Sequence, residues 1–358
     1  GIRMCNELLE NIDRVPDLDP ELKKRYIGEA KVLRAYNYYE LYTKFGDVPY
    51  TTKVLSIKES MSIARTAKAT VIANVLADLD EVINGNYLPT SYDADNKGRI
   101  TRWAAMAIKA KIYLFEGNWT QVKNITSTIM TEGGFKLFGS YAGLFEIANE
   151  YNSEVILDAQ YRPTSREHQM MYVFLPPTLG GYSQLSPLQE LVDSYIMLDG
   201  KTIKETGTSF DESHPYANRD PRLKATVMYT GNSYTLADGT EVVINCEKGE
   251  GKDGYGVGSD CSATGYYIKK YWDNTYRATL YSGLNPILIR YADILLMNAE
   301  ALAELGELDK TAWDATIKPI RDRAGFTLAS ALEFPEGASK DKLIEIVRNE
   351  RRSELALE

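Results

Sequence analysis

The stretch GEAKVLRAYNYYELYTKFGDVPY, residues 28–50, decides the fold class. Apolar and aromatic residues cover most of its helical surface and leave a thin polar stripe, which comprises Lys31, Arg34, Asn37, Glu40 and Lys44. A helix that is apolar on nearly all sides packs between neighbouring elements. Asp19-Pro20 is a typical helix start, and Gly46 is a natural helix end. The pattern therefore predicts a buried helix over residues 20–45, followed by a sharp turn.

Further helical pairs lie on both sides of the middle of the chain. Apolar residues at helical spacing predict a helix over residues 67–84. Residues 101–131 predict a helical hairpin, and residues 286–324 repeat the scheme with helices over 288–305 and 311–323. Small residues on one helix, a glycine turn and a second amphipathic helix are similar to a tetratricopeptide unit. The irregular period predicts a degenerate array of helical hairpins that share a continuous core.

The middle of the chain has a different composition. Residues 133–285 are rich in Gly, Tyr, Ser and Asp, and their strand-like runs are residues 155–160, 226–229, 241–244 and 266–271. Loops supported on a rigid frame often carry binding residues. We expect one all-α dominated domain over residues 1–358, with a helical scaffold in 1–132, a loop-rich ligand-binding insertion with short strands in 133–285, and scaffold again in 286–358.

Composition limits the possible partners. The chain has 358 residues and a net charge of −9, which argues against nucleic acid and anionic membrane surfaces. No run of 18 apolar residues is present to span a membrane. Three cysteines are an odd number and do not form a disulfide framework, although Cys246 and Cys261 could pair in an oxidising compartment.

Residues suited to catalysis are few. His168 and His214 are the two histidines, and neither has metal-ligand neighbours at a typical spacing. Asp93 and Asp95 resemble the start of a calcium-binding loop, but Lys97 breaks the pattern. With 50 acidic residues, finding a pair of carboxylates has little discriminating power. We expect no catalytic residue, no metal and no cofactor.

Charged residues inside apolar helical segments need partners. We expect Asp293, Glu300, Glu350 and Glu354 to form ion pairs between stacked helices. Their expected partners are Arg290, Arg321, Arg323, Arg348, Arg351 and Arg352.

Aromatic residues gather in the insertion and suggest a binding site. They are Tyr255, Tyr266, Tyr267, Tyr271, Trp272, Tyr276 and Tyr281. Alternation over residues 266–272 predicts that some rings point inward and others outward. Rings beside amide or guanidinium groups suit a pyranose, which has an apolar face and polar hydroxyls. The candidate ligand-binding residues are Trp272, Tyr276, Tyr182, Tyr172, Asn274 and Arg277. The alternative is that these rings pack the insertion onto the scaffold.

The run E-A-x-x-L-R-A-x-x-Y-x-x-L-x-x-x-F-G-D-V-P at residues 29–49 resembles the signature of the SusD/RagB family. NRDPRL at 218–223, LIRYADILL at 288–296 and ERRSEL at 350–355 are also similar to motifs of that family. The resemblance extends nearly from end to end. These motifs belong to the scaffold and do not select a ligand.

The resemblance implies a non-catalytic glycan-binding lipoprotein of Bacteroidetes on the outer surface of the outer membrane. Its partner would be a SusC-like TonB-dependent transporter, and its membrane contact a lipid anchor that is absent from this otherwise soluble chain. The chain looks trimmed relative to the family at both ends. Two alternatives are an all-α glycoside hydrolase, which the few catalytic residues disfavour, and a protein-binding tetratricopeptide-type adaptor, which the aromatic-rich insertion disfavours.

Overall fold

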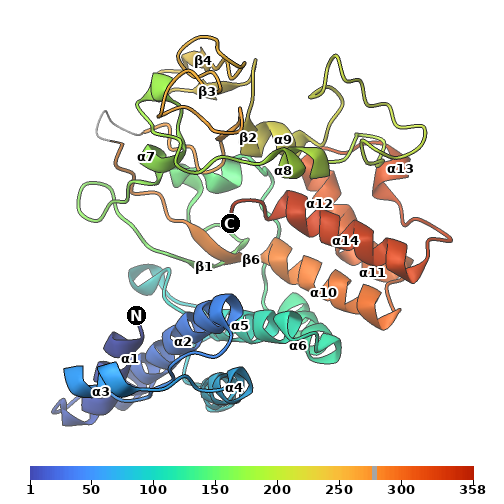
Figure 1. The fold of residues 1–358 in the computed structure, drawn as a ribbon. Helices are drawn as coiled ribbons and strands as arrows, with labels where there is room; N and C mark the ends of the chain where they lie inside the picture. Colours follow the sequence, from blue (N-terminus) through green and yellow to red (C-terminus); the bar gives the residue numbers. More distant parts are fainter. Residues whose placement is uncertain (276–279) are drawn as a thin grey trace. The chain divides into compact units, whose positions relative to one another are not determined.

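The computed structural model describes residues 1–275 and 280–358, and the chain divides into two compact units, Gly1–Gly134 and Phe135–Glu358 (Figure 1). Helices predominate and the strands are short, which confirms the all-α dominated fold class. The expected division into scaffold and insertion stays a prediction, and each unit is described by itself.

The first unit is made of helices. They are α1 (Ile2–Asn11), α2 (Pro20–Phe45), α3 (Ile57–Ser62), α4 (Lys68–Asn84), α5 (Arg102–Phe115) and α6 (Trp119–Glu132). Helix α2 packs against α1 and α4, and α5 packs against α4 and α6. The Asp19 carboxylate accepts the Leu22 N–H at 2.8 Å and caps α2. Gly46 ends the helix at a φ of 67°, which a glycine adopts without strain.

The buried face of α2 differs from the prediction. Arg34, expected on the polar stripe, is only 5% exposed, and its guanidinium pairs with Asp78 of α4 at 2.6 Å. Leu33 and Phe45, expected inside, are 44% and 63% exposed. Apolar residues surround nearly the whole helix, so the sequence does not mark its inner face. The position of the half-buried Asp78 carboxylate on α4 accounts for the burial of Arg34.

The other helices of this unit follow the prediction. The spaced apolar residues of α4 are buried, namely Val71, Val75, Leu79 and Val82. The hairpin of α5 and α6 is confirmed, and the Thr101 hydroxyl caps α5 by accepting the Ala104 N–H at 3.3 Å. Small alanines on α5 permit the close approach of its neighbours.

The second unit combines short strands, loops and helices. Its main elements are β1 (Val155–Asp158), α7 (Met170–Phe174), α8 (Gln189–Ser194), α9 (Pro221–Thr226), β2 (Val227–Met228), β3 (Ser233–Thr235), β4 (Glu241–Val243), β5 (Tyr267–Ile268), β6 (Ile287–Arg290), α10 (Tyr291–Leu305), α11 (Lys310–Ala315), α12 (Ile317–Ala324), α13 (Ala329–Leu332) and α14 (Lys340–Glu354). The described strands pair antiparallel as β1–β6, β2–β5 and β3–β4. Helix α10 packs against α12 and α14 (Figure 1).

Two helix boundaries in this unit were predicted wrongly. Residues 288–290 belong to β6, which pairs with β1, and α10 begins at Tyr291. The predicted helix over 311–323 is two helices, α11 and α12, separated at Thr316. Pro319 explains the break, because proline has no N–H to donate to the Ala315 carbonyl and its ring would clash there.

Buried ion pairs hold the second unit together. The Glu354 carboxylate lies 2.6 Å from Arg290 and 2.8 Å from Arg222, and it also pairs with Arg323. Glu154, before β1, pairs with Arg290 at 2.8 Å and with Arg323 at 3.1 Å. None of these five side chains is more than 4% exposed. These ion pairs connect helix α14 with strand β6, with helices α9 and α12, and with the residue before β1.

The remaining expected ion pairs are also largely confirmed. Glu350 pairs with Arg321, Asp293 with Arg351, and Glu300 with both Arg348 and Arg351. Arg352 is the exception: it is exposed, and it has no ion pair within the described part of the chain. The charges in these helices are therefore mainly structural.

Candidate carbohydrate-binding site

A pocket of about 360 Å³ lies in the second unit beside Trp272. Its walls come from the segment that follows β5, from α9, from the end of β3 and from a turn near Phe145. Two of the six predicted ligand-binding residues, Trp272 and Asn274, line it together. The volume lies at the small end of the range for pockets that hold small molecules.

The local backbone fixes the position of the Trp272 ring. The indole N–H donates to the Thr235 carbonyl at 2.8 Å, and the ring meets Tyr234 edge-on with centroids 5.1 Å apart. Tyr271, just before it, is buried and has a φ of 62°, which turns the chain sharply after β5. Trp272 is consequently a half-buried, anchored ring, and exposed Asn274 lines the same pocket.

Two other predicted residues form a separate stacked pair. The rings of Tyr172 and Tyr182 are 4.2 Å apart at an angle of 27°, and the Tyr182 N–H donates to the Tyr172 carbonyl at 2.9 Å. The hydrogen bond between their side chains is the main cause that raises the pKa of Tyr172. Neither ring lines the pocket beside Trp272. Tyr276 and Arg277, the last two candidates, lie outside the described residues.

Several aromatic residues of the cluster have a packing role. Tyr266, Tyr267 and Tyr271 are all buried, so the expected alternation of rings inward and outward is wrong. The reason is that β5 lies between two apolar clusters: Tyr266 packs with Tyr195, and Tyr267 packs with the larger core around Tyr234. Trp272 differs from these three because it keeps an exposed surface.

Sequence reasoning missed the charged residues of this pocket. Lys224, Lys269 and Glu146 line it together with Trp272. Lys269 lies three residues before Trp272, a local signal that could have been used, whereas Lys224 is brought near by the pairing of β2 with β5. Asp273 is buried and accepts the hydroxyls of Thr275 and Ser282, so it serves the loop itself.

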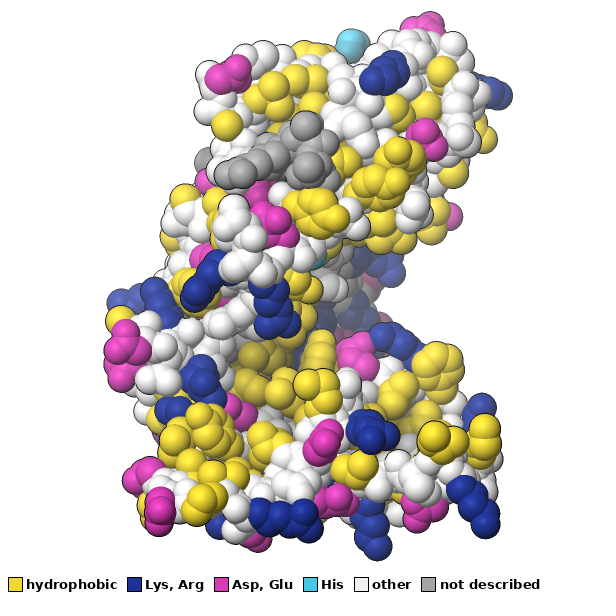
Figure 2. All heavy atoms as spheres, turned by 90° about the vertical axis from the view of Figure 1, so that its left-hand side faces the viewer, with side chains coloured by type: hydrophobic (Ala, Val, Ile, Leu, Met, Phe, Trp, Pro, Cys, Tyr) yellow, Lys and Arg dark blue, Asp and Glu magenta, His cyan; other side chains and the backbone are white. Residues whose placement is uncertain are grey.

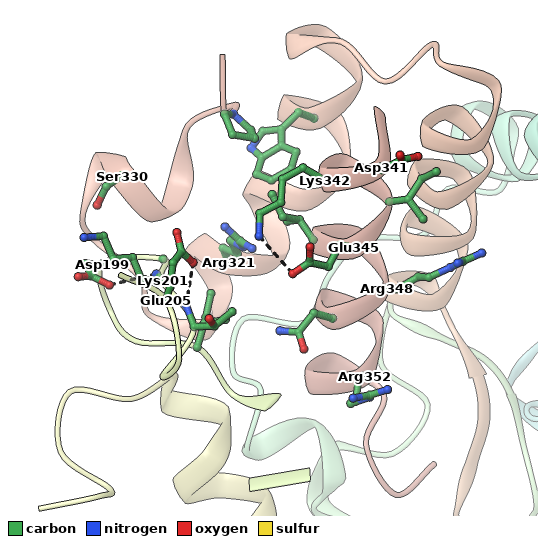
Figure 3. A pocket seen from close by; sticks show the side chains of 18 of the residues that line it. Asp199, Lys201, Glu205, Arg321, Ser330, Asp341, Lys342, Glu345, Arg348 and Arg352 are labelled. Atoms are coloured by element: carbon green, nitrogen blue, oxygen red, sulfur yellow. Dashed lines mark hydrogen bonds and ion pairs between the residues drawn. The ribbon is translucent and has the colours of Figure 1, made fainter. Parts of the chain in front are cut away.

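A larger pocket of about 1040 Å³ lies between α14 and the segment that follows α8. Figure 3 shows charged side chains of both signs around it, with Lys342 paired to Glu345. Its one aromatic side chain among the described lining residues is Trp313. That ring is 1% exposed, donates its N–H to the Leu332 carbonyl, and has the Arg321 guanidinium 5.3 Å from its centre. This pocket offers no free ring face for a sugar.

The described residues offer little for metal or redox chemistry. No group of three or more His, Cys, Asp or Glu side chains in residues 1–275 and 280–358 is arranged to hold a metal ion. Cys246 and Cys261 are both free thiols. His168 bonds through its ring to the Leu284 carbonyl at 2.8 Å. None of the helices found here is both long and apolar enough to cross a membrane.

Charges of both signs are mixed on one face of the molecule. On the face drawn in Figure 2, basic and acidic side chains are interspersed with apolar ones, and neither sign dominates a wide area.

Comparison with protein families gives two matches. The model of the SusD family matches residues 144–358. A second model, described as "Starch-binding associating with outer membrane", matches residues 1–114. Together the two matches cover most of both units.

Individual relatives agree with these matches. SusD-like proteins P25 and P38 of Formosa agariphila are 27% and 25% identical over 98% and 97% of this chain. The chain spans 65% of the length of P25 and 67% of that of P38.

Solved structures show the same fold. A SusD-like carbohydrate-binding protein from Bacteroides fragilis superposes with a TM-score of 0.86 at 28% identity, covering 99% of this chain and 68% of that one. A second SusD-like protein from the same species gives a TM-score of 0.82 at 28% identity, with 99% and 71% covered.

Proposed function

Because the chain belongs to the SusD family, we propose that it binds glycans at the cell surface and does not cleave them. One observation carries the proposal: Trp272, anchored and half-buried, shares a pocket with exposed Asn274. An aromatic face beside an amide suits a sugar ring, whose C–H face packs on the indole while its hydroxyls bond to polar groups.

The relatives support this reading. The solved structure with a TM-score of 0.86 is of a protein described as carbohydrate-binding, and the family model over residues 1–114 is described as starch-binding. The glycan itself is not selected by these observations.

The proposal extends to a partner and a location. The family description associates its members with the outer membrane. We propose that a lipid anchor holds this protein there, where it delivers captured glycans to a SusC-like TonB-dependent transporter. The stacked Tyr172–Tyr182 pair is a second proposed platform for the same ligand, because Tyr182 is 38% exposed.

Calorimetric titration with a panel of oligosaccharides tests the proposal. We expect one class of sugar to bind, and Trp272→Ala to weaken that binding about tenfold or more, since a buried aromatic anchor contributes at least 1.4 kcal/mol. Trp272→Phe keeps a ring but loses the bond to the Thr235 carbonyl, and should retain part of the affinity. Tyr255→Ala removes an exposed ring that does not line the pocket, and serves as the matched control.

The same samples separate the competing functions. Chromatography of the ligand after prolonged incubation should show no product, whereas a glycoside hydrolase would release shorter sugars. Binding of no sugar at all would contradict the proposal and favour a protein-binding adaptor. Equal sugar binding by the parent and Trp272→Ala would keep the function and reject the site.

A further inference from the structure

The pocket beside Trp272 has a local excess of positive charge in an acidic chain. Lys224, Lys269 and Lys270 line it, against one carboxylate, Glu146. Lys270 is buried and already satisfied, because its ammonium bonds to the Tyr141 hydroxyl at 3.0 Å, the Ala356 carbonyl at 2.8 Å and a carboxylate. The other two lysines are different.

Lys224 and Lys269 differ from Lys270 in their partners. Within residues 1–275 and 280–358, neither ammonium forms an ion pair. Lys224 is exposed on α9, whereas Lys269 is half-buried and donates one hydrogen bond to the Asn232 amide oxygen at 3.1 Å. The third lysine of the pocket, Lys270, pairs with Glu358, so the other two stand out.

Electrostatics favour an anion at this place. Burial lowers the pKa of Lys269, and the positive charge of Lys224 acts in the same direction. The negative charge of Glu241 acts in the opposite direction; its carboxylate accepts the Thr235 hydroxyl at 2.5 Å and the Ser233 hydroxyl, and it does not line the pocket. An anion that contacts both lysines would relieve their mutual repulsion and form charge-assisted hydrogen bonds.

The lysines and the indole ring line one small pocket. We propose that this pocket selects glycans bearing an anionic substituent, a sulfate ester or a uronate carboxylate, with Trp272 against the sugar ring and Lys224 and Lys269 on the charged group. The inference rests on the proposed function and names its class of substrate. Lys224 and Lys269 are then specificity-determining residues.

The test compares matched ligands on the whole chain. Starting from the sugar backbone that the oligosaccharide panel selects, titrations use its neutral, sulfated and uronate forms, and inorganic sulfate alone. We expect at least one anionic form to bind about tenfold or more tightly than the neutral form, because a hydrogen bond to a charged group contributes about 1.5–3 kcal/mol. Whether the sulfated or the uronate form binds more tightly identifies the anion.

Variants then assign the effect. Lys224→Gln and Lys269→Gln should each remove most of the preference for the anionic form, measured as the ratio of its affinity to that of the neutral form. Lys248→Gln, an exposed lysine of the same unit outside the pocket, should change nothing. Glutamine at position 269 can still donate to Asn232, and circular dichroism of each variant checks the fold.

The possible failures are distinct. Equal affinity for neutral and anionic forms, lost in Trp272→Ala, would overturn this inference and leave the proposed function standing. Tight binding of sulfate alone, with the sulfated sugar unaffected by Trp272→Ala, would reduce the site to an anion site and also overturn it. If no sugar binds in any form, the proposed function itself fails.

Discussion

The two units are stabilised by different kinds of interaction. In Gly1–Gly134, long helices bury apolar side chains such as Val71, Leu79 and Ile108, and most of its ion pairs include an exposed side chain. In Phe135–Glu358, short strands and loops surround a buried network centred on Glu354. Regular helices satisfy their own backbone and need only an apolar face. Irregular segments lack that repeated pattern, and buried arginines tie them to specific carboxylates.

The difference also concerns function. Trp272 lies two residues after Lys270, whose buried ammonium pairs with Glu358, and its own ring is held by Tyr234 and Thr235 of β3. Burying an ion pair contributes little net stability, whereas removing one of its two partners is strongly destabilising. The second unit should therefore be the more sensitive to changes in charge, and the first to changes in volume.

Acidification should give the largest separation between the units. Burial alone would raise the pKa of Glu354, but the charges of Arg290, Arg323 and Arg222 outweigh it and hold the pKa well below 4.5. A carboxyl whose pKa is lower in the folded than in the unfolded chain stabilises the fold at pH values above its unfolded pKa. That stabilisation is lost as the pH falls below about 4.5. Hydrogen exchange, read separately for each unit, should show the second unit opening first.

The pKa of the Asp158 carboxyl, in the same unit, is shifted in the opposite direction. Burial raises the pKa of Asp158 to about 6, so its protonation stabilises the fold as the pH falls from about 6 toward 4. Stability of the second unit should accordingly pass through a maximum in this mildly acidic range before it falls. A monotonic rise of its stability from pH 6 down to pH 3 would contradict the role given to the network.

Removing one member of the network should have the next largest effect. Glu354→Ala leaves three arginines without that partner and should destabilise the second unit by about 3–5 kcal/mol. Glu345→Ala, on the same helix α14, removes a surface pair with Lys342 and should cost about 1 kcal/mol or less. Denaturant titration measures both, and equal effects would show that the network is unimportant.

A cavity in the first unit gives the complementary test. Leu79 on α4 is fully buried, and Leu79→Ala should cost about 3 kcal/mol through lost burial and the cavity left behind. Leu33→Ala on α2 should change stability by less than about 0.5 kcal/mol, because Leu33 is 44% exposed. If Leu33→Ala were the more damaging, the burial found for α2 would be wrong. In hydrogen exchange, the loss of protection caused by Leu79→Ala should be confined to the first unit.

Local signals predicted the helices well, and distant contacts caused the errors. Asp19-Pro20 and Thr101 marked helix starts because capping depends on neighbouring residues. Strand β6 was missed because its partner lies far away: Glu154 and Arg290 are 136 residues apart. The break before α12 was readable, since Pro319 is a local signal.

In the candidate site, too, local signals were predicted correctly and distant contacts were missed. Trp272 and Asn274 were predicted as neighbours in the sequence, and they line one pocket. Lys224 could not be predicted, because the pairing of β2 with β5, which are distant in the sequence, brings its helix to this segment. Tyr172 and Tyr182 were predicted together with Trp272, yet they form their own stack outside the pocket.

The most direct measurement is a crystal structure of the protein with its tightest-binding oligosaccharide. The account predicts a sugar ring packed against the indole of Trp272, a hydroxyl bonded to Asn274, and an intact glycosidic bond. A sugar bound in the larger pocket beside α14, with the pocket of Trp272 empty, would contradict it.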